Sequence, residues 1–153
     1  MAFTFEAANV DNLLEAADVE ISVDEAAIFS ESNWLGQPLA GSAPITVTNL
    51  GSVNVDVYLT ADWRGAVGTN IRMATILANR LHALVEVGAE QPYDDTFVNL
   101  VDVLIIEDLP FDNDNSQDVA ITLSLEAGAE LTNILQDVGV EFDLIFVAFA
   151  EAV

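Results

Sequence analysis

A run of oxygen-bearing side chains at positions 112–118 (D-N-D-N-S-Q-D) has residue types and spacing that could bind a metal ion. The candidate ligands stand at alternate positions and are Asp112, Asp114, Ser116 and Asp118. Their oxygens suit a hard cation such as Ca²⁺, which takes about six to eight of them. An EF-hand loop would have glycine in place of Gln117, and Asp, Asn and Ser are also ordinary residues of a solvated turn. We therefore expect no required cofactor, with Ca²⁺ as an optional ligand.

Residues that could carry out acid–base or nucleophilic catalysis are scarce. His82 is the only histidine, and it lies in the apolar stretch Leu81–Val87, where a lone histidine is more often structural than a general base. The chain has no cysteine and no H-E-x-x-H, G-x-S-x-G or Gly-rich phosphate motif. Paired carboxylates abound, but 26 acidic residues supply such pairs by chance. We expect no catalytic residue and no enzymatic activity.

Two further groups of residues could bind a partner. Arg64, Arg72 and Arg80 are the only cations, and they could face acidic residues of a second copy or of their own domain. We favour their own domain, because exposed ion pairs contribute only about 0–1 kcal/mol. Trp34 and Trp63 could form a platform for a sugar, but an isolated tryptophan in a β-sandwich more often packs in the core.

The charge of the chain limits its partners. Its 153 residues include 26 Asp and Glu against 3 Lys and Arg, a formal net charge of −23. Recognition of nucleic acids and anionic membranes depends on Lys and Arg, so neither is an expected partner. Copies of the chain repel one another until salt, divalent cations or low pH weaken the repulsion. The same acidity would also suit the solvated surface of a protein from a saline habitat.

The apolar content is high for so acidic a chain. Hydrophobic residues make up 52%, and the mean hydropathy is +0.41. The longest apolar run, Leu144–Ala150, is far shorter than the roughly 20 residues of a membrane-spanning helix. We therefore expect no membrane span, and we expect some apolar surface to be buried against other protein.

The elements that must position these residues are mainly strands, because apolar and polar residues alternate with period two. The segment 45–59 predicts a hairpin, with Asn49-Leu50-Gly51 as its turn. Other predicted strands are Val19–Val23, Leu81–Val87, Val101–Glu107, Val119–Leu125 and Val140–Phe149. The last becomes apolar on both faces from Leu144 onward, which is typical of a central or covered strand.

Helix signals are short, over Asn70–Arg80 and Glu130–Gln136, and Gly36–Pro44 is predicted to be a loop. Seven or eight short strands separated by turn residues favour an all-β protein, a β-sandwich with jelly-roll-like or Ig-like topology. One sandwich domain over residues 11–153 accounts for the chain length.

Two segments carry a family resemblance. One is Gly41–Leu59, with its T-V-T-N-L-G-S turn before a strand of alternating apolar residues, and the other is the final strand Val140–Ala148. Both are similar to the TasA/camelysin family of secreted biofilm-matrix fibre proteins, which archaeal bundling pili also resemble. The resemblance implies a jelly-roll subunit that polymerises by donating its N-terminal strand to the next subunit. The metalloprotease activity described for some camelysins is not carried over, because the chain has no set of zinc ligands.

The N-terminus offers an independent reason to expect strand donation. Residues 1–10 form the expected donor strand and linker, and Phe3, Phe5 and Ala7 alternate with polar residues at a terminus where chains are usually polar. In a neighbour's sheet these side chains would fill pockets, with Phe142, Leu144 and Phe146 as candidate acceptor residues. The alternative is that residues 3–7 fold back as the first strand of their own domain.

The leading hypothesis is therefore a secreted homopolymer, the subunit of a pilus or biofilm-matrix fibre, located outside the cell or on its surface. The start of the chain has neither a basic segment nor a long apolar segment of a signal peptide, so the numbering would be that of a processed mature chain or the protein would be cytosolic. The alternative function is a monomeric cell-surface adhesin or carbohydrate-binding β-sandwich module.

Overall fold

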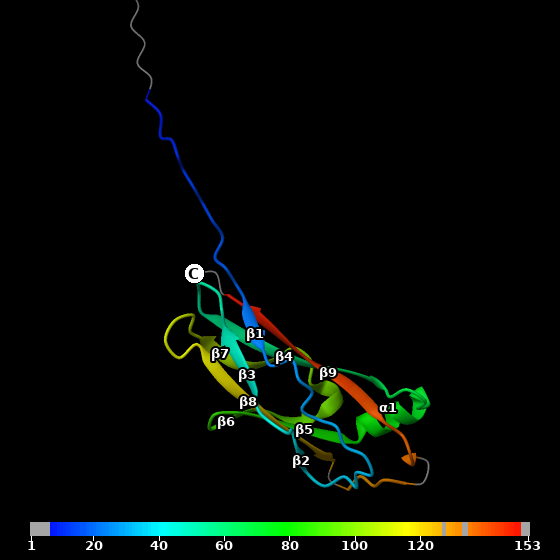
Figure 1. The fold of residues 1–153 in the computed structure, drawn as a ribbon. Helices are drawn as coiled ribbons and strands as arrows, with labels where there is room; N and C mark the ends of the chain where they lie inside the picture. Colours follow the sequence, from blue (N-terminus) through cyan, green and yellow to red (C-terminus); the bar gives the residue numbers. More distant parts are fainter. Residues whose placement is uncertain (1–6, 127, 133–134, 151–153) are drawn as a thin grey trace, which may run out of the picture.

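The computed structural model describes residues 7–126, 128–132 and 135–150, which form two antiparallel β-sheets (Figure 1). In spatial order the larger sheet consists of β1 (Ile21–Val23), β3 (Ile45–Asn49), β8 (Ser116–Leu125), β5 (Leu81–Val87) and β6 (Glu90–Thr96), and β2 (Leu39–Ala40) also pairs with β8. The smaller sheet consists of β7 (Val103–Leu109), β4 (Val55–Gly65) and β9 (Val140–Phe149). The expected all-β sandwich is confirmed.

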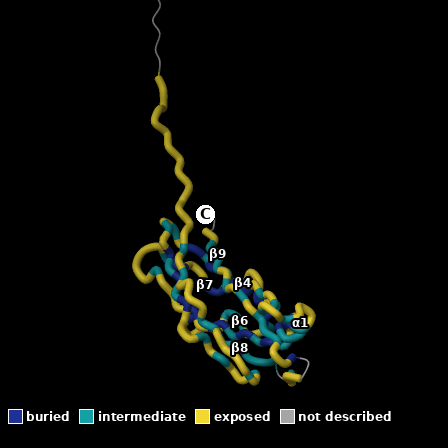
Figure 2. Tube along the Cα trace, turned by 45° about the vertical axis from the view of Figure 1, so that its right-hand side comes forward, coloured by how far each residue is buried: buried dark blue, intermediate teal, exposed yellow. Residues whose placement is uncertain are grey.

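The hydrophobic core contains residues of both sheets, and the buried positions lie on strands of both (Figure 2). Every second side chain of β3 and β5, and of the first half of β4, is buried. This follows from the alternation in the sequence, because successive side chains of a strand point to opposite faces. The short 3₁₀ helix Phe97–Asn99 adds Phe97, which is almost completely buried.

The helix α1 (Ile71–Asn79) follows β4. It begins after Asn70, whose side-chain oxygen accepts a hydrogen bond from the backbone N–H of Arg72 at 2.9 Å. Such a cap satisfies one of the free N–H groups at a helix start. The predicted helix over Asn70–Arg80 is thus confirmed to within one residue at each end. Among the described residues, no helix has the length and apolar character needed to span a membrane.

The predicted hairpin over residues 45–59 is wrong. β3 pairs with β1 and β8, whereas β4 pairs with β7 and β9, so the chain crosses between sheets after Asn49. Asn49 is fully buried at this crossing. Its amide group donates to the carbonyl oxygens of Val53 (2.8 Å) and Leu109 (3.0 Å), and its Oδ1 accepts from the N–H of Gly51 (2.9 Å). Turn residues predict a change in chain direction, but they do not predict which sheet the next strand joins.

Smaller differences concern two strands that were not predicted, the start of another strand and one predicted helix. β6 was not expected, because it is polar and contains Pro92, which a strand tolerates at a sheet edge. β2 lies within the predicted loop Gly36–Pro44. The strand expected over Val101–Glu107 begins at Val103, and residues 130–132, part of an expected helix, are not helical.

Residues 7–17, here called the arm, are exposed and extend away from the body of the domain (Figures 1 and 2). The arm joins the body at Asp18, whose N–H donates to Ser52 Oγ and whose carbonyl oxygen accepts from Ser52 N, both at 2.9 Å. Gly51 is needed here, because a Cβ at that position would lie 2.2 Å from the carbonyl oxygen of Asp18. The turn after Asn49 therefore holds the base of the arm.

Candidate assembly surface

β9 forms one edge of the smaller sheet. Its ten residues pair with β4 in a single register, from Asp56 opposite Phe149 to Gly65 opposite Val140. In the described part of the chain no strand pairs with its other side, so a row of N–H and C=O groups there is available to a further strand. The strand was expected to be central or covered. It is not central, because it is an edge strand, and no described element covers its outward face; cover by another copy stays a prediction.

The inward face of β9 carries the predicted acceptor residues. Phe142, Leu144 and Phe146 all point toward the core and are half-buried. The ring of Phe142 lies 5.2 Å from the ring of Phe97 and 5.6 Å from that of Phe29. Because these side chains border the free edge, a strand added there would cover the part of them that solvent still reaches.

The outward face of the smaller sheet carries a group of apolar side chains, here called the outer stripe. It consists of Tyr58, Leu104, Ile145, Val147 and Phe149, contributed by β4, β7 and β9. Ile145, Val147 and Phe149 are 42%, 40% and 56% exposed. The rings of Tyr58 and Phe149 meet edge to face at 5.3 Å. The apolar run at 144–149 signals the β9 members in the sequence, but nothing local signals Tyr58 and Leu104, which the sheet pairing brings to them.

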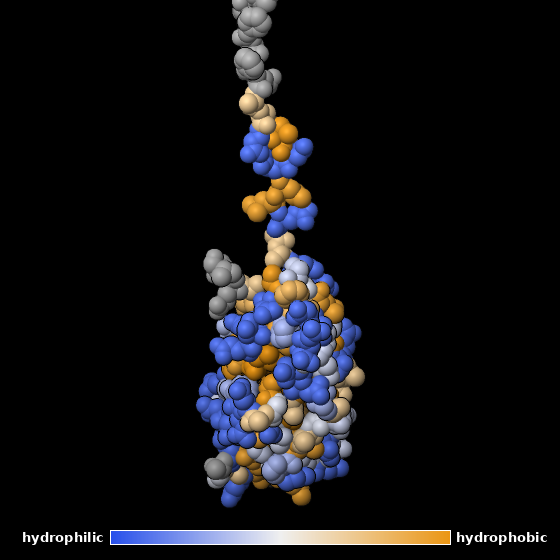
Figure 3. Space-filling view, turned by 90° about the vertical axis from the view of Figure 1, so that its left-hand side faces the viewer, coloured by the Kyte–Doolittle hydropathy of each residue, from blue (hydrophilic) through white to orange (hydrophobic). Residues whose placement is uncertain are grey.

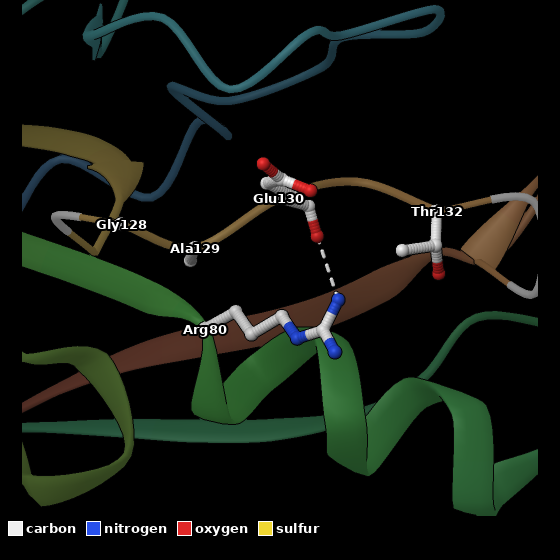
Figure 4. Close-up of a pocket in the computed structure, with 5 residues that line it drawn as sticks. All are labelled: Arg80, Gly128, Ala129, Glu130 and Thr132. Atoms are coloured by element: carbon white, nitrogen blue, oxygen red, sulfur yellow. Dashed lines mark hydrogen bonds between the residues drawn. The ribbon is translucent and has the colours of Figure 1, made fainter.

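Arg64 pairs with carboxylates of its own domain, as favoured from the sequence, but among the described residues no such pair is found for the other two arginines. Arg64 lies beside the polar half of β9, 3.5 Å from Glu141 and 3.1 Å from Asp143, and its hydrogen bond with Asp143 raises its pKa. Arg80 donates to the carbonyl oxygen of Glu130 at 2.6 Å, beside an open hollow of about 380 Å³ (Figure 4). Neither arginine is thus a free docking group for an acidic neighbour.

The predicted calcium ligands are not gathered around one point. Asp112 and Asp114 lie in the turn between β7 and β8, whereas Ser116 and Asp118 lie on β8 and bind side chains of β3. Ser116 Oγ is 2.8 Å from Thr48 Oγ1, and Thr46 Oγ1 donates to Asp118 Oδ1 at 2.7 Å. Among the described residues no three His, Asp or Glu side chains are grouped so as to hold a metal ion. Calcium binding stays a prediction.

His82 lies between two carboxylates. Its Nε2 is 2.5 Å from Asp94 Oδ1 on β6, and its Nδ1 is 3.4 Å from Glu126 Oε2 at the end of β8. The hydrogen bond to Asp94 raises the pKa of His82 above its ordinary value of 6.5; burial opposes this change and Glu126 adds to it. Through these two contacts the group joins β5, β6 and the chain after β8.

The stability of the domain is expected to depend on the charge of His82. The pKa of His82 is raised on folding, so the protonated side chain stabilises the folded state. This stabilisation is complete below the ordinary pKa of 6.5 and is lost as the pH rises through the higher pKa of the folded state. The His82–Asp94 and His82–Glu126 pairs are partly exposed, so we expect a loss of only about 0.5–1 kcal/mol as the pH rises from below 6.5 through the raised pKa. Urea unfolding of the wild type and of His82→Gln at several pH values measures this loss, because the variant has no group that titrates at this position. Equal pH dependence in both proteins would contradict the assignment.

The two tryptophans pack against the core and are half-buried. Trp34 Nε1 donates to the carbonyl oxygen of Gln37 at 2.8 Å, and Trp63 lies on the inward face of β4. Neither stands on the outer stripe. Their packing agrees with the structural interpretation of both residues.

Of the three predicted donor residues, the structure describes only one. Phe3 and Phe5 lie outside the described residues, and Ala7 is exposed at the start of the arm. Strand donation therefore stays a prediction. A scan against protein-family models finds no match for the chain, and a search of curated proteins finds no significant match.

Proposed function

We propose that the protein is the subunit of an extracellular filament, a pilus or matrix fibre, in which the N-terminal strand of one copy pairs with the free edge of β9 in the next. The observation that carries this proposal is the contrast between β9 and the other edge strands. A long, regular edge with apolar residues invites pairing with another chain, and proteins usually protect such edges.

The other edges of the described sheets are each protected. β1 has only three residues, and β2, which pairs only with β8, has two. β6 contains Pro92 and exposed carboxylates, and its register with β5 shifts near Val87. β7 pairs with β4 through two register shifts and exposes Glu107 and Asp108. β9 alone among them combines ten residues, an unbroken register and apolar side chains on both faces. This strand is the natural acceptor of a donated strand.

Strand donation would also complete the core. Phe3, Phe5 and Ala7 would lie on the inward side of the added strand, beside the half-buried Phe142 and Phe146 of the acceptor. Burial of each phenylalanine contributes about 1.5–3 kcal/mol before the cost of ordering the chain. The main chain of the donor would form a ladder of hydrogen bonds with β9.

Two further arguments support this assembly. The arm carries Ala7 away from the body of the domain, where another copy can reach it (Figure 1). The turn at Thr46–Ser52, which resembles that of secreted fibre proteins, holds the base of the arm through Gly51 and Ser52. Since each copy carries a charge of −23, the filament should form most readily where salt or divalent cations screen the repulsion.

Negative-stain electron microscopy of the purified chain tests the proposal, with a variant that lacks Met1–Ala8 as the comparison. We expect filaments from the intact chain in screening salt and single particles from the shortened chain, because the donor is missing. The shortened chain should retain its unfolding transition, which separates loss of assembly from loss of folding.

Single particles from both proteins across salt and pH would contradict the filament proposal. That result, combined with glycan binding by the stable monomer, would favour the adhesin or carbohydrate-binding alternative. Filaments from both proteins would leave polymerisation in place and remove the N-terminal strand as its cause.

A further inference from the structure

The arm carries apolar side chains that no described part of its own chain covers. Val10, Leu13 and Leu14 are 66%, 80% and 97% exposed, and apolar atoms gather at two places along the arm (Figure 3). Their spacing, with Ala17, puts all four on one side of an α-helix. In the isolated chain the arm is not helical, and Asp11 has a φ of 62°.

The outer stripe is the second uncovered apolar surface of the same chain. Its centre lies where Tyr58 stands opposite Val147, and a hollow of about 290 Å³ opens between Tyr58, Asp102 and Phe149. It faces away from the core, so a donated strand beside β9 would leave it exposed. Filament formation by strand donation alone would therefore not bury it.

We propose that the arm of one copy docks on the outer stripe of the next copy, as a short helix that buries Val10, Leu13 and Leu14. This inference rests on the proposed strand donation for its geometry. With Ala7 beside β9, Val10 follows three residues later and is within about 10 Å of the strand at roughly 3.3 Å per residue. The short connection gives the arm a high effective concentration at the stripe, because docking becomes an intramolecular step.

The arm of another copy is a better partner for the outer stripe than the outer stripe of another copy would be. Two stripes placed face to face would bring together Asp62, Glu141 and Asp143 from both copies. Each copy has one arginine, Arg64, against these three carboxylates, so the two faces repel. A docked helix would instead direct Glu15 away from the stripe, on the opposite side of the helix, and would leave Asp11 at the flank of the contact. Each copy offers one arm and one stripe, so the contact is head-to-tail and compatible with a growing filament.

The sequence of the arm also suits a helix that forms on docking. Asn9 is a favoured N-cap residue. In the free arm Asn12 Nδ2 donates to the carbonyl oxygen of Asn9 at 3.0 Å, a local bond that competes with a helix until the arm docks. An isolated helix shorter than about 12–15 residues is marginal in water. The free arm is therefore expected to be unfolded and to gain its helix only against the next subunit.

Cysteine cross-linking tests the contact cleanly, because the chain has no cysteine. The probe is the double variant Leu14→Cys, Val147→Cys, and the matched control is Asn12→Cys, Val147→Cys, whose arm cysteine lies on the opposite side of the helix. After mild oxidation, pelleted filaments and the soluble fraction are separated on denaturing gels. We expect a ladder of covalent multimers in the filaments, at least about fivefold stronger for the probe than for the control.

The outcomes separate this contact from strand donation. Filaments that give no selective ladder would overturn arm docking and leave strand donation in place. A selective covalent product from the soluble fraction, without filaments, would retain arm docking and contradict the filament. No selective product in either fraction overturns arm docking.

A charge substitution gives a second measurement that does not depend on oxidation. Leu14→Asp should raise the critical concentration for assembly by about tenfold or more, since burial of one leucine is worth about that factor in an association constant. Asn12→Asp adds the same charge on the far side of the helix and should change it by less than about threefold. Equal effects from both substitutions would mean that the added charge, and not docking of Leu14, determines the critical concentration, and this would contradict the proposal.

Discussion

The double substitution Phe3→Asp, Phe5→Asp is expected to abolish filaments while leaving the domain folded. Each phenylalanine is expected to contribute about 1.5–3 kcal/mol when it inserts beside β9 of the next copy. Loss of both corresponds to a fall in the association constant of roughly two to four orders of magnitude. Sedimentation of the polymer and negative-stain microscopy, in salt that supports wild-type assembly, measure the effect.

The matched control for this experiment is Ala2→Asp, Thr4→Asp. It adds the same two charges to the alternate residues, which a donated strand would direct away from the core of the acceptor. Filaments from the control and none from the Phe variant would support the assigned face of the donor. If the Phe variant instead lost its unfolding transition, the phenylalanines would belong to their own domain, and strand donation would be contradicted.

Replacement of Asn49 with alanine is expected to lower the free energy of unfolding by about 3 kcal/mol. The side chain is fully buried, and it satisfies the carbonyl oxygens of Val53 and Leu109 and the N–H of Gly51. Alanine leaves these backbone groups without that partner, and a buried unsatisfied group costs about 1–3 kcal/mol. Urea unfolding at neutral pH measures the change as a shift of the midpoint at constant slope.

Two comparison variants sharpen this prediction. Asn49→Asp keeps the acceptor for Gly51 but places a carboxylate beside two carbonyl oxygens, so it should destabilise at least as much as alanine. Asn54→Ala is the control: Asn54 is exposed, and its amide donates to Asp108 at 3.2 Å. Its removal should cost less than about 1 kcal/mol. A change of similar size for Asn49→Ala and Asn54→Ala would contradict the role assigned to the buried amide.

The Asn49 network also connects stability with assembly. The same turn that joins the two sheets through Asn49 holds the base of the arm through Gly51 and Ser52. A variant that weakens the turn should therefore weaken both the fold and the attachment of the arm, whereas substitutions in the arm itself should affect assembly alone. This difference allows the stability and assembly measurements to be interpreted together.

Much of the local structure could be predicted from the sequence. The alternation of apolar and polar residues gave the faces of β4, β5 and β8 correctly, because successive side chains of a strand point in opposite directions whatever the strand pairs with. The helix after Asn70 was also predictable, since capping depends on residues a few positions apart. The inward direction of Phe142, Leu144 and Phe146 follows from the same alternation.

The positions of the strands in the sheets were decided only by the tertiary structure. The sequence suggested that β3 and β4 pair and that β9 is central or covered, but β3 and β4 belong to different sheets and β9 is an edge. Pairing depends on contacts between residues far apart in the chain, such as Tyr58 with Val147, and a local pattern holds no information about them. Sequence alone thus identified an apolar final strand, and the tertiary structure placed it at a free edge beside the outer stripe.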